Sequence, residues 1–155
     1  MGDFVALLDA VRACRLCEPE LPEDARPLLQ AAPGARILIA GQAPGHRAHA
    51  SGIVFDDASG ERLRQWMGIE RARFYDPSAV AVLPMGFCYP GKTGSGDLPP
   101  RPECASAWRA RLLASMPKVE LTLLLGRHAQ AWHLHEDARS LTARVKDWRA
   151  NWPEM

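Results

Sequence analysis

A short apolar run, Arg36-Ile37-Leu38-Ile39-Ala40, passes directly into the glycine-rich turn Gly41-Gln42-Ala43-Pro44-Gly45. An apolar segment of this length, bounded by glycine, is typical of a strand that is buried on both faces. Two further apolar runs lie at residues 79–83 and 119–125. Segments with helical periodicity separate the three runs. This alternation predicts an α/β fold with a parallel sheet covered on both faces.

The helices are expected from the spacing of apolar residues and from capping residues. One of them begins at the predicted cap Ser59, with Leu63, Trp66 and Met67 on its apolar face. The predicted helices lie within residues 3–15, after 59, after 102, around 129–132 and within 141–148. Because the carboxyl ends of parallel strands share one edge, the loops 41–58 and 84–102 are expected to meet there.

The chain has 155 residues, of which 47% are hydrophobic and 24% charged, and its formal net charge is +1. These values are ordinary for globular proteins, so we expect one domain with a buried core. The balanced charge excludes a highly basic, tail-driven nucleic-acid binder but allows a local basic face. No apolar stretch is long enough to cross a membrane, and the first residues do not resemble a secretory signal. We therefore expect a cytoplasmic protein with no membrane partner.

Four cysteines, Cys14, Cys17, Cys88 and Cys104, need an explanation other than disulfide bonds in a cytoplasmic protein. Cys14 and Cys17 form a C-x-x-C pair, which folding can bring to the two later cysteines. Such a set is typical of a four-thiolate metal site. Four thiolates suit both zinc and an iron–sulfur cluster, and scattered cysteines can also be free core thiols.

Residues 86–93, GFCYPGKT, fit the phosphate-binding pattern G-x-x-x-x-G-K-[ST] and follow a predicted strand. A phosphate-binding loop also needs a helix that begins at the lysine, because the helix N-terminus supplies amides and a favourable dipole. The segment after Lys92 is rich in glycine and proline and does not suit a helix. We interpret the match as accidental, and nucleotide binding stays only as a weak alternative.

The loop after the first strand contains two segments that suit a ligand site. The glycines of Gly41–Gly45 let the backbone turn sharply and approach a ligand closely. Further on, Phe55 can stack on a flat ligand, and Asp56 or Asp57 can orient a water molecule. Each feature also has an ordinary structural explanation: a plain turn, a core phenylalanine, and an aspartate that caps the next helix.

Taken in order, GQAPG at 41–45, FDDASG at 55–60 and a cysteine-containing Gly/Pro loop resemble the uracil-DNA glycosylase superfamily. The cysteines resemble those of its iron–sulfur branches, in which a C-x-x-C pair near the N-terminus joins two later cysteines. The resemblance covers the chain from Cys14 to about Trp148. It implies a three-layer α/β/α fold around a short central parallel sheet. It also implies a [4Fe–4S] cluster, with zinc as the alternative, on Cys14, Cys17, Cys88 and Cys104.

The resemblance further implies roles for the loop residues. Gly41–Gly45 corresponds to the motif that shapes the uracil pocket and positions the attacking water, with Gln42 where several branches have an acid. Phe55 corresponds to the aromatic residue that stacks on the flipped base. Asp57, or its neighbour Asp56, resembles an acid that some branches use in place of the first-motif acid.

The sequence departs from the superfamily pattern in two places. Pro84 stands where related enzymes hold an asparagine that reads the uracil edge, so the base selectivity is open. Members also carry a last motif, His-Pro-Ser or similar, whose histidine stabilises negative charge on the base. This chain reaches Trp152-Pro153-Glu154-Met155 about where the strand before that motif is expected. We therefore expect residues 1–155 to form one glycosylase-like domain that is incomplete at its C-terminus.

The resemblance implies a DNA-repair hydrolase that flips uracil or a related deaminated base and hydrolyses its N-glycosidic bond. Its partner is then DNA containing such a base, with Lys92 and Arg101 suited to phosphate contacts. We expect a monomer.

A second hypothesis is a non-catalytic nucleic-acid-binding module that keeps the metal-stapled fold. Gln42, Pro84 and the missing last motif favour this module. Phe55 and the two aspartates that follow it favour the enzyme.

Overall fold

The computed structural model describes residues 2–134 and 140–151. Its centre is a three-stranded sheet of β1 (Ile37–Ala40), β2 (Val80–Val82) and β5 (Leu121–Leu124). The strand order is β2-β1-β5, and both strand pairs are parallel. The predicted parallel sheet is therefore confirmed, with the strand before the glycine-rich turn at its centre.

Alternate residues of the strands point into two separate cores, as expected for a sheet buried on both faces. Leu38 and Ala81 belong to one core. Ile39, Val80 and Val82 belong to the other. All five residues are at most 1% exposed, so both faces of the sheet are covered at these positions.

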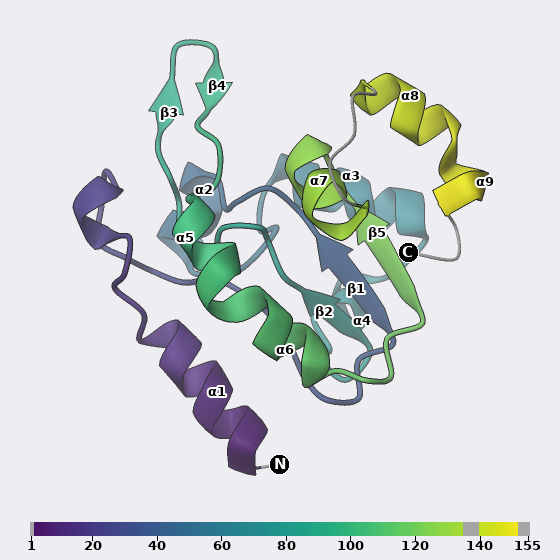
Figure 1. Ribbon diagram of the computed structural model, residues 1–155, viewed down its shortest axis with the longest axis horizontal. Helices are drawn as coiled ribbons and strands as arrows, with labels where there is room; N and C mark the ends of the chain where they lie inside the picture. Colours follow the sequence, from purple (N-terminus) through teal and green to yellow (C-terminus); the bar gives the residue numbers. More distant parts are fainter. Residues whose placement is uncertain (1, 135–139, 152–155) are drawn as a thin grey trace.

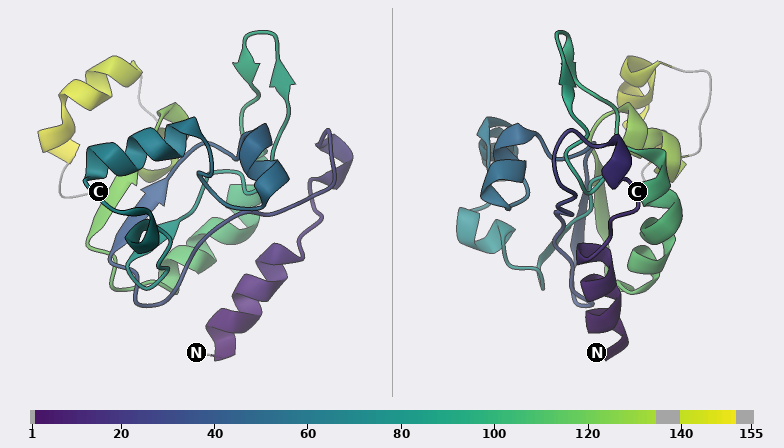
Figure 2. Two further views of the ribbon diagram at one scale, coloured as in Figure 1. Left: turned by 180° about the vertical axis from the view of Figure 1, so that it is seen from behind. Right: turned by 90° about the vertical axis from the view of Figure 1, so that its left-hand side faces the viewer.

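Helices cover both faces of the sheet (Figures 1 and 2). On one side lie α1 (Gly2–Arg12) and α6 (Ala110–Ala114). On the other side lie α2 (His46–Ser51), α3 (Ala58–Met67) and α4 (Arg71–Phe74). This arrangement is the expected three-layer α/β/α fold.

The start of α3 differs from the prediction of a Ser59 cap and confirms the alternative, an aspartate that caps this helix. The cap is Asp57, whose carboxylate accepts a hydrogen bond from the backbone N–H of Gly60 (2.8 Å). Ser59 is the second residue of the helix, so its predicted capping role is wrong. On the predicted apolar face, Leu63 is buried but Trp66 is 78% exposed.

The two long loops contain structure of their own. The first carries α2, and the second carries a short hairpin of β3 (Lys92–Thr93) and β4 (Gly96–Asp97). The hairpin extends away from the rest of the molecule (Figure 1).

Most of the remaining described elements are helices, and an extended segment of residues 21–36 leads from η1 into β1. A continuous helical segment runs from α5 (Pro102–Cys104) through η2 (Ala105–Arg109), a π-helical turn, into α6. The remaining elements are η1 (Glu18–Glu20), α7 (Arg127–Leu134), α8 (Leu141–Lys146) and α9 (Trp148–Asn151). Among the described helices, none has the length and apolar character needed to span a membrane. Residues 152–155, on which the expected C-terminal departure depends, lie outside the described residues.

Candidate functional site

A pocket lies at the carboxyl edge of the sheet, where the loops after β1 and β2 meet. Its lining residues are Gly41, Gln42, Ala43, Pro44, Gly45, Ala48, Val54, Phe55, Asp57 and Pro84. The backbone N–H of Met85 donates to the carbonyl of Gly41 (2.8 Å), and that of Gly86 donates to the carbonyl of Gln42 (3.0 Å). These bonds join the two loops, as their shared edge predicts. The pocket thus brings together every residue that the sequence suggested for substrate binding.

The ring of Phe55 forms one wall of this pocket. It packs edge-on against Phe74, with ring centroids 6.2 Å apart and the planes at 89°. A Cβ atom at Gly41 would lie 3.3 Å from Cζ of Phe55, which is tighter than ordinary contact. Glycine at position 41 therefore leaves room for the ring. Phe55 serves the core and the pocket at once.

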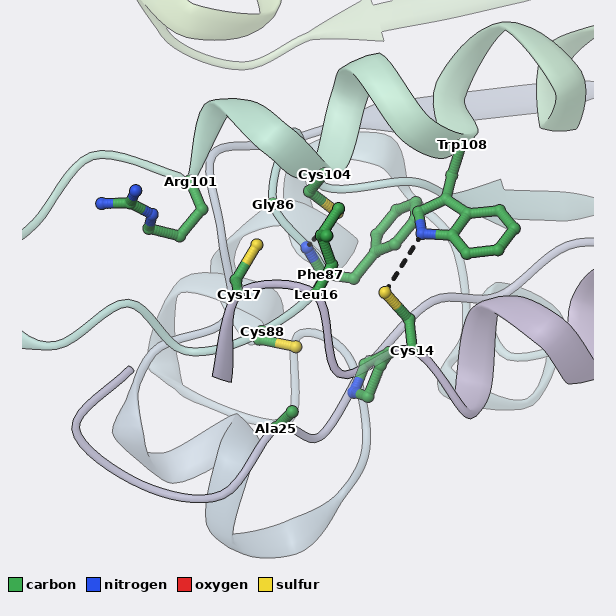
Figure 3. Close-up of a pocket in the computed structure, with 11 residues that line it drawn as sticks. Cys14, Leu16, Cys17, Ala25, Gly86, Phe87, Cys88, Arg101, Cys104 and Trp108 are labelled. Atoms are coloured by element: carbon green, nitrogen blue, oxygen red, sulfur yellow. Dashed lines mark hydrogen bonds between the residues drawn. The ribbon is translucent and has the colours of Figure 1, made fainter. Parts of the chain in front are cut away.

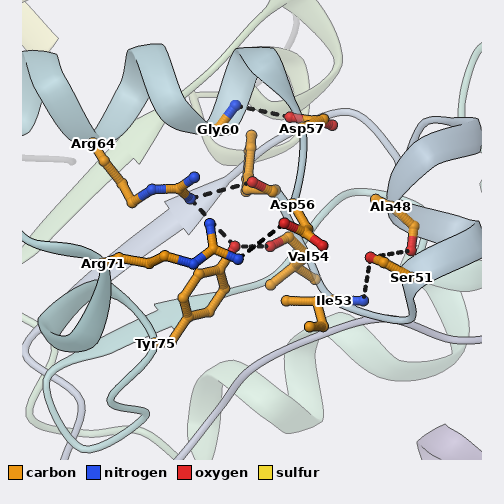
Figure 4. A network of polar contacts seen from close by, with 11 residues as sticks. Ala48, Ser51, Ile53, Val54, Asp56, Asp57, Gly60, Arg64, Arg71 and Tyr75 are labelled. Atoms are coloured by element: carbon orange, nitrogen blue, oxygen red, sulfur yellow. Dashed lines mark hydrogen bonds and ion pairs between the residues drawn. The ribbon is translucent and has the colours of Figure 1, made fainter.

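The two aspartates lie in different surroundings (Figure 4). Asp57 lines the pocket while its carboxylate caps α3. Asp56 forms an ion pair with Arg71, with 2.9 Å between Oδ1 and Nη2. This hydrogen bond lowers the pKa of Asp56 below its usual value. Asp57 is therefore the acid that faces the pocket, and Asp56 belongs to a separate polar network.

Gln42 lies at the rim of the pocket and reaches toward the hairpin. Its Nε2 donates to the carbonyl of Leu98 (3.2 Å), just after β4. A glutamine amide can both donate and accept hydrogen bonds, but it cannot take a proton as a base. Gln42 is therefore suited to holding a water molecule rather than to activating it.

The four cysteines line a second cavity, which we call the thiol cavity (Figure 3). Cys14 and Cys17 come from the segment after α1, Cys88 from the loop after β2, and Cys104 from the end of α5. The structure therefore brings the C-x-x-C pair to the two later cysteines, as the sequence indicates.

The sulfur atoms of the thiol cavity have polar neighbours. The indole N–H of Trp108 donates to Sγ of Cys14 (3.3 Å), and the backbone N–H of Phe87 donates to Sγ of Cys104 (3.4 Å). The bond from Phe87 favours the thiolate form of Cys104, which is the form that binds metals. The Cys17 thiol instead donates to Oε2 of Glu103 (3.3 Å).

Burial disfavours the thiolate form of three of the four cysteines. Burial raises the pKa of Cys104 to about 12, and burial with the Glu103 hydrogen bond raises that of Cys17 to about 12. Burial also raises the pKa of Cys88, although a hydrogen bond from the backbone of Arg26 partly opposes this effect. A bound cation reverses this balance because it deprotonates coordinating thiols.

The donor set fits a metal group in its chemistry. Four thiols share one cavity, and two of their sulfur atoms already accept N–H bonds. Among the described residues, 2–134 and 140–151, no group of three or more His, Cys, Asp or Glu side chains is arranged so that it could hold a metal ion. The sulfur atoms thus surround a common space without converging on one point.

The two residues suggested for phosphate contacts lie in different places. Lys92 is exposed on β3 of the hairpin. Arg101 lines the thiol cavity and pairs with Glu103, with 2.8 Å between Nη2 and Oε1. A strand begins at Lys92 where a phosphate-binding loop needs a helix, so the prediction that the segment after Lys92 is not helical is confirmed.

Sequence reasoning missed two buried arginines beside the pocket. Arg109 is 1% exposed, and its Nη1 donates to the carbonyls of Leu83 (3.0 Å) and Pro84 (3.1 Å). Arg64 is 6% exposed and donates to the carbonyl of Phe55 (3.2 Å). Both lie on helices where an arginine is ordinarily exposed, so periodicity alone carries no signal for their burial.

The fold and the pocket define a three-layer α/β protein with a ligand site at the carboxyl edge of its parallel sheet. The family model of the Uracil DNA glycosylase superfamily matches residues 30–152. The chain therefore belongs to the uracil DNA glycosylase superfamily. This membership supports a DNA glycosylase-like function and DNA as the bound substrate.

Proposed function

We propose that the protein is a hydrolase that removes uracil, or a related deaminated base, from DNA. The observation that carries this proposal is the single pocket in which Gly41–Gly45, Phe55 and Asp57 meet. Superfamily membership supports the same class of reaction. The pocket has a flat aromatic wall, backbone amides and one acid, which are the groups that excision of a base needs.

The pocket compensates for the cost of extracting a base. Flipping a nucleotide out of the stack costs a few kcal/mol. Stacking on the ring of Phe55 recovers part of that cost, and backbone N–H groups of Gly41–Gly45 supply donors to the base oxygens. Pro44 removes one of these donors because proline has no N–H group. The same donors stabilise the negative charge that develops on the departing base.

Hydrolysis then requires a water molecule and an acid near the sugar. The water oxygen forms a bond to C1′, the glycosidic bond breaks, and its electron pair leaves with the base nitrogen. Gln42 holds the water, and the carboxylate of Asp57 accepts its proton. The negative charge of Asp57 also stabilises the positive charge that grows on the sugar.

We also propose that the thiol cavity holds a [4Fe–4S] cluster through Cys14, Cys17, Cys88 and Cys104. Four cysteine thiolates are the usual ligands of such clusters. The shared cavity and the N–H donors to two sulfur atoms support this proposal. When bound, the group would cross-link the segment after α1 to the loop after β2. Zinc is the alternative, and iron, sulfide and zinc analysis of anaerobically purified protein distinguishes the two.

One observation favours a second candidate function, a nucleic-acid-binding module without catalysis. Pro84 lines the pocket, and its side chain offers neither a donor nor an acceptor to a base edge. A module of this kind would bind DNA and release no base.

The first test is excision of uracil from labelled single-stranded and mismatched duplex DNA by anaerobically purified protein. Release of uracil supports the enzyme. DNA binding without release of uracil or of other deaminated bases supports the binding module.

The aspartates give a sharper test of the pocket. Asp57→Asn should lower the excision rate by about 10²-fold or more, the range expected for loss of a general base. Asparagine is as good a helix cap as aspartate, so α3 should stay intact. Asp56→Asn is the matched control and should have little effect, because Asp56 pairs with Arg71 outside the pocket lining. Equal effects of the two changes would contradict the role of Asp57.

A further inference from the structure

Phe55 has an unusual backbone conformation. Its φ angle is 55°, and it is the one non-glycine residue with positive φ among the described residues. For a bulky residue this left-handed conformation is strained, and such strain persists only where surrounding contacts enforce it. The contacts that hold Phe55 therefore also determine where its ring lies in the pocket.

Two side chains hold the backbone at this point (Figure 4). Nη1 of Arg64 donates to the carbonyl of Phe55 (3.2 Å) and to the hydroxyl of Tyr75 (3.2 Å). The same hydroxyl donates to the carbonyl of Val54 (2.6 Å). Two consecutive carbonyls, those of Val54 and Phe55, are thus fixed by one connected pair of side chains, which we call the Arg64–Tyr75 clamp.

Packing around the clamp restricts its own movement. The guanidinium group of Arg64 lies over the rings of Phe74 (5.1 Å to the centroid) and Tyr75 (5.4 Å). On the helix side, a Cβ atom at Gly60 would lie 1.8 Å from the carbonyl oxygen of Phe55. Only glycine permits this close approach of α3 to the strained residue. The guanidinium group of Arg64 and the backbone of α3 at Gly60 therefore enclose the carbonyl of Phe55 from two sides.

We propose that Arg64 is a positioning residue for base binding: with Tyr75, it keeps Phe55 left-handed so that the aromatic wall is formed before a base enters. This inference rests on the proposed function for the identity of the ligand. Arg64 is not among the residues that line the pocket, so it acts through Phe55. A wall formed in advance improves affinity because no ordering cost is left for the binding step.

The first experiment reads the backbone directly by hydrogen exchange. In Arg64→Lys and in Tyr75→Phe, the amides of residues 53–57 should exchange at least about tenfold faster, while those of β1 and β2 stay protected. Arg73→Lys is the matched control, because Arg73 lies on the same short helix, α4, and pairs with Asp76 rather than with a residue of 53–57. Unchanged exchange at 53–57 in both clamp variants, or equal loosening of the whole sheet, would overturn the proposal.

The second experiment separates base binding from DNA binding. Inhibition by free uracil reports the pocket, and binding of a duplex with a tetrahydrofuran abasic analogue reports the DNA surface. Arg64→Lys should weaken uracil inhibition about tenfold and leave the affinity for the abasic duplex within about twofold. Weakening of both ligands alike, or of neither, would overturn the positioning role.

The two experiments also separate this inference from the proposed function. If the unaltered protein neither excises nor binds uracil, the proposed function fails and the link from the clamp to a base fails with it. Hydrogen exchange still decides whether Arg64 and Tyr75 hold Phe55 in place, since it needs no ligand.

Discussion

The buried Arg109 and the half-buried His133 form a pair beside the pocket at the carboxyl edge of the sheet. One side of the guanidinium group donates to the carbonyls of Leu83 and Pro84, just after β2. The other side faces Nε2 of His133, which lies 3.2 Å from Nε and 3.0 Å from Nη2 of Arg109. Because arginine can only donate, His133 accepts at Nε2 and is neutral. Burial, together with the charge of Arg109, lowers the pKa of His133 to about 4.

This pair predicts a pH dependence of stability. The unfolded chain has the ordinary histidine pKa of 6.5, so between pH 6.5 and 4 the unfolded state binds more protons than the folded state. The free energy of unfolding should therefore be level above pH 6.5 and fall as the pH drops toward 4. Thermal or urea unfolding measured across this range checks the expectation.

The control for this prediction is His133→Gln, which can still accept a hydrogen bond but does not titrate. It should reduce the fall between pH 6.5 and 4, and the part that remains includes His128, whose pKa is also lowered by burial. The lowered pKa values of Asp56 and Glu103 act in a lower range, since their stabilisation is lost as the pH falls below their ordinary values near 4. An equally steep fall in the variant would show that His133 is not the responsible group.

At the scale of elements, the β3–β4 hairpin is a projecting, largely exposed feature that a DNA partner could contact. It projects from the loop that borders the pocket, and Leu98 at its base accepts the hydrogen bond from Gln42 (Figure 1). Lys92 is exposed on its first strand, whereas Arg101 is held by Glu103. A lysine that contacts phosphate adds salt-dependent affinity without sequence preference.

Lys92→Ala should therefore weaken DNA binding a few-fold and lower the slope of log affinity against log salt by about one unit. Titrations at several salt concentrations measure this slope. Lys118→Ala is the matched control, because Lys118 is exposed just before β5, at the opposite edge of the sheet. If both variants change the slope equally, the hairpin makes no specific phosphate contact.

The elements also show how far sequence reasoning reaches. The three strands and the meeting of the two loops follow from apolar runs and glycine-rich turns, which are local signals. Local signals do not show which of Asp56 and Asp57 faces the pocket. That orientation depends on the left-handed turn at Phe55, and a phenylalanine gives no sign of that conformation. The exposure of Trp66 was missed for a similar reason, since only tertiary packing decides which part of the apolar stripe on α3 is covered.

At the scale of the whole molecule, the thiol cavity joins parts of the chain that the sheet does not connect. Val11 of α1 packs in the same core as Leu112 of α6. The segment after α1, which carries Cys14 and Cys17, meets Cys88 and Cys104 at the thiol cavity. A metal group bound there would tie this segment to the loop that carries Cys88.

Cys88→Ser should lower the melting temperature by on the order of 10 °C, because loss of one ligand removes the binding energy of the metal group. The visible absorption of an iron–sulfur cluster should be lost as well. Calorimetry and absorption spectra of anaerobically purified protein check both effects. Stripping the metal from the unaltered protein should reproduce the lower melting temperature, and an unchanged melting curve in Cys88→Ser would contradict the structural role.

The central place of β1 has a consequence for the newly made chain. Ile37 pairs with Val80 on one side and with Leu121 on the other, so the strand that is synthesised first is the one that needs both later strands. While the ribosome is still adding residues before β5, one edge of β1 has no partner and its apolar side chains are only partly covered. We therefore expect the nascent chain to stay sensitive to proteases and to chaperone binding until β5 has emerged, and to fold cooperatively only then.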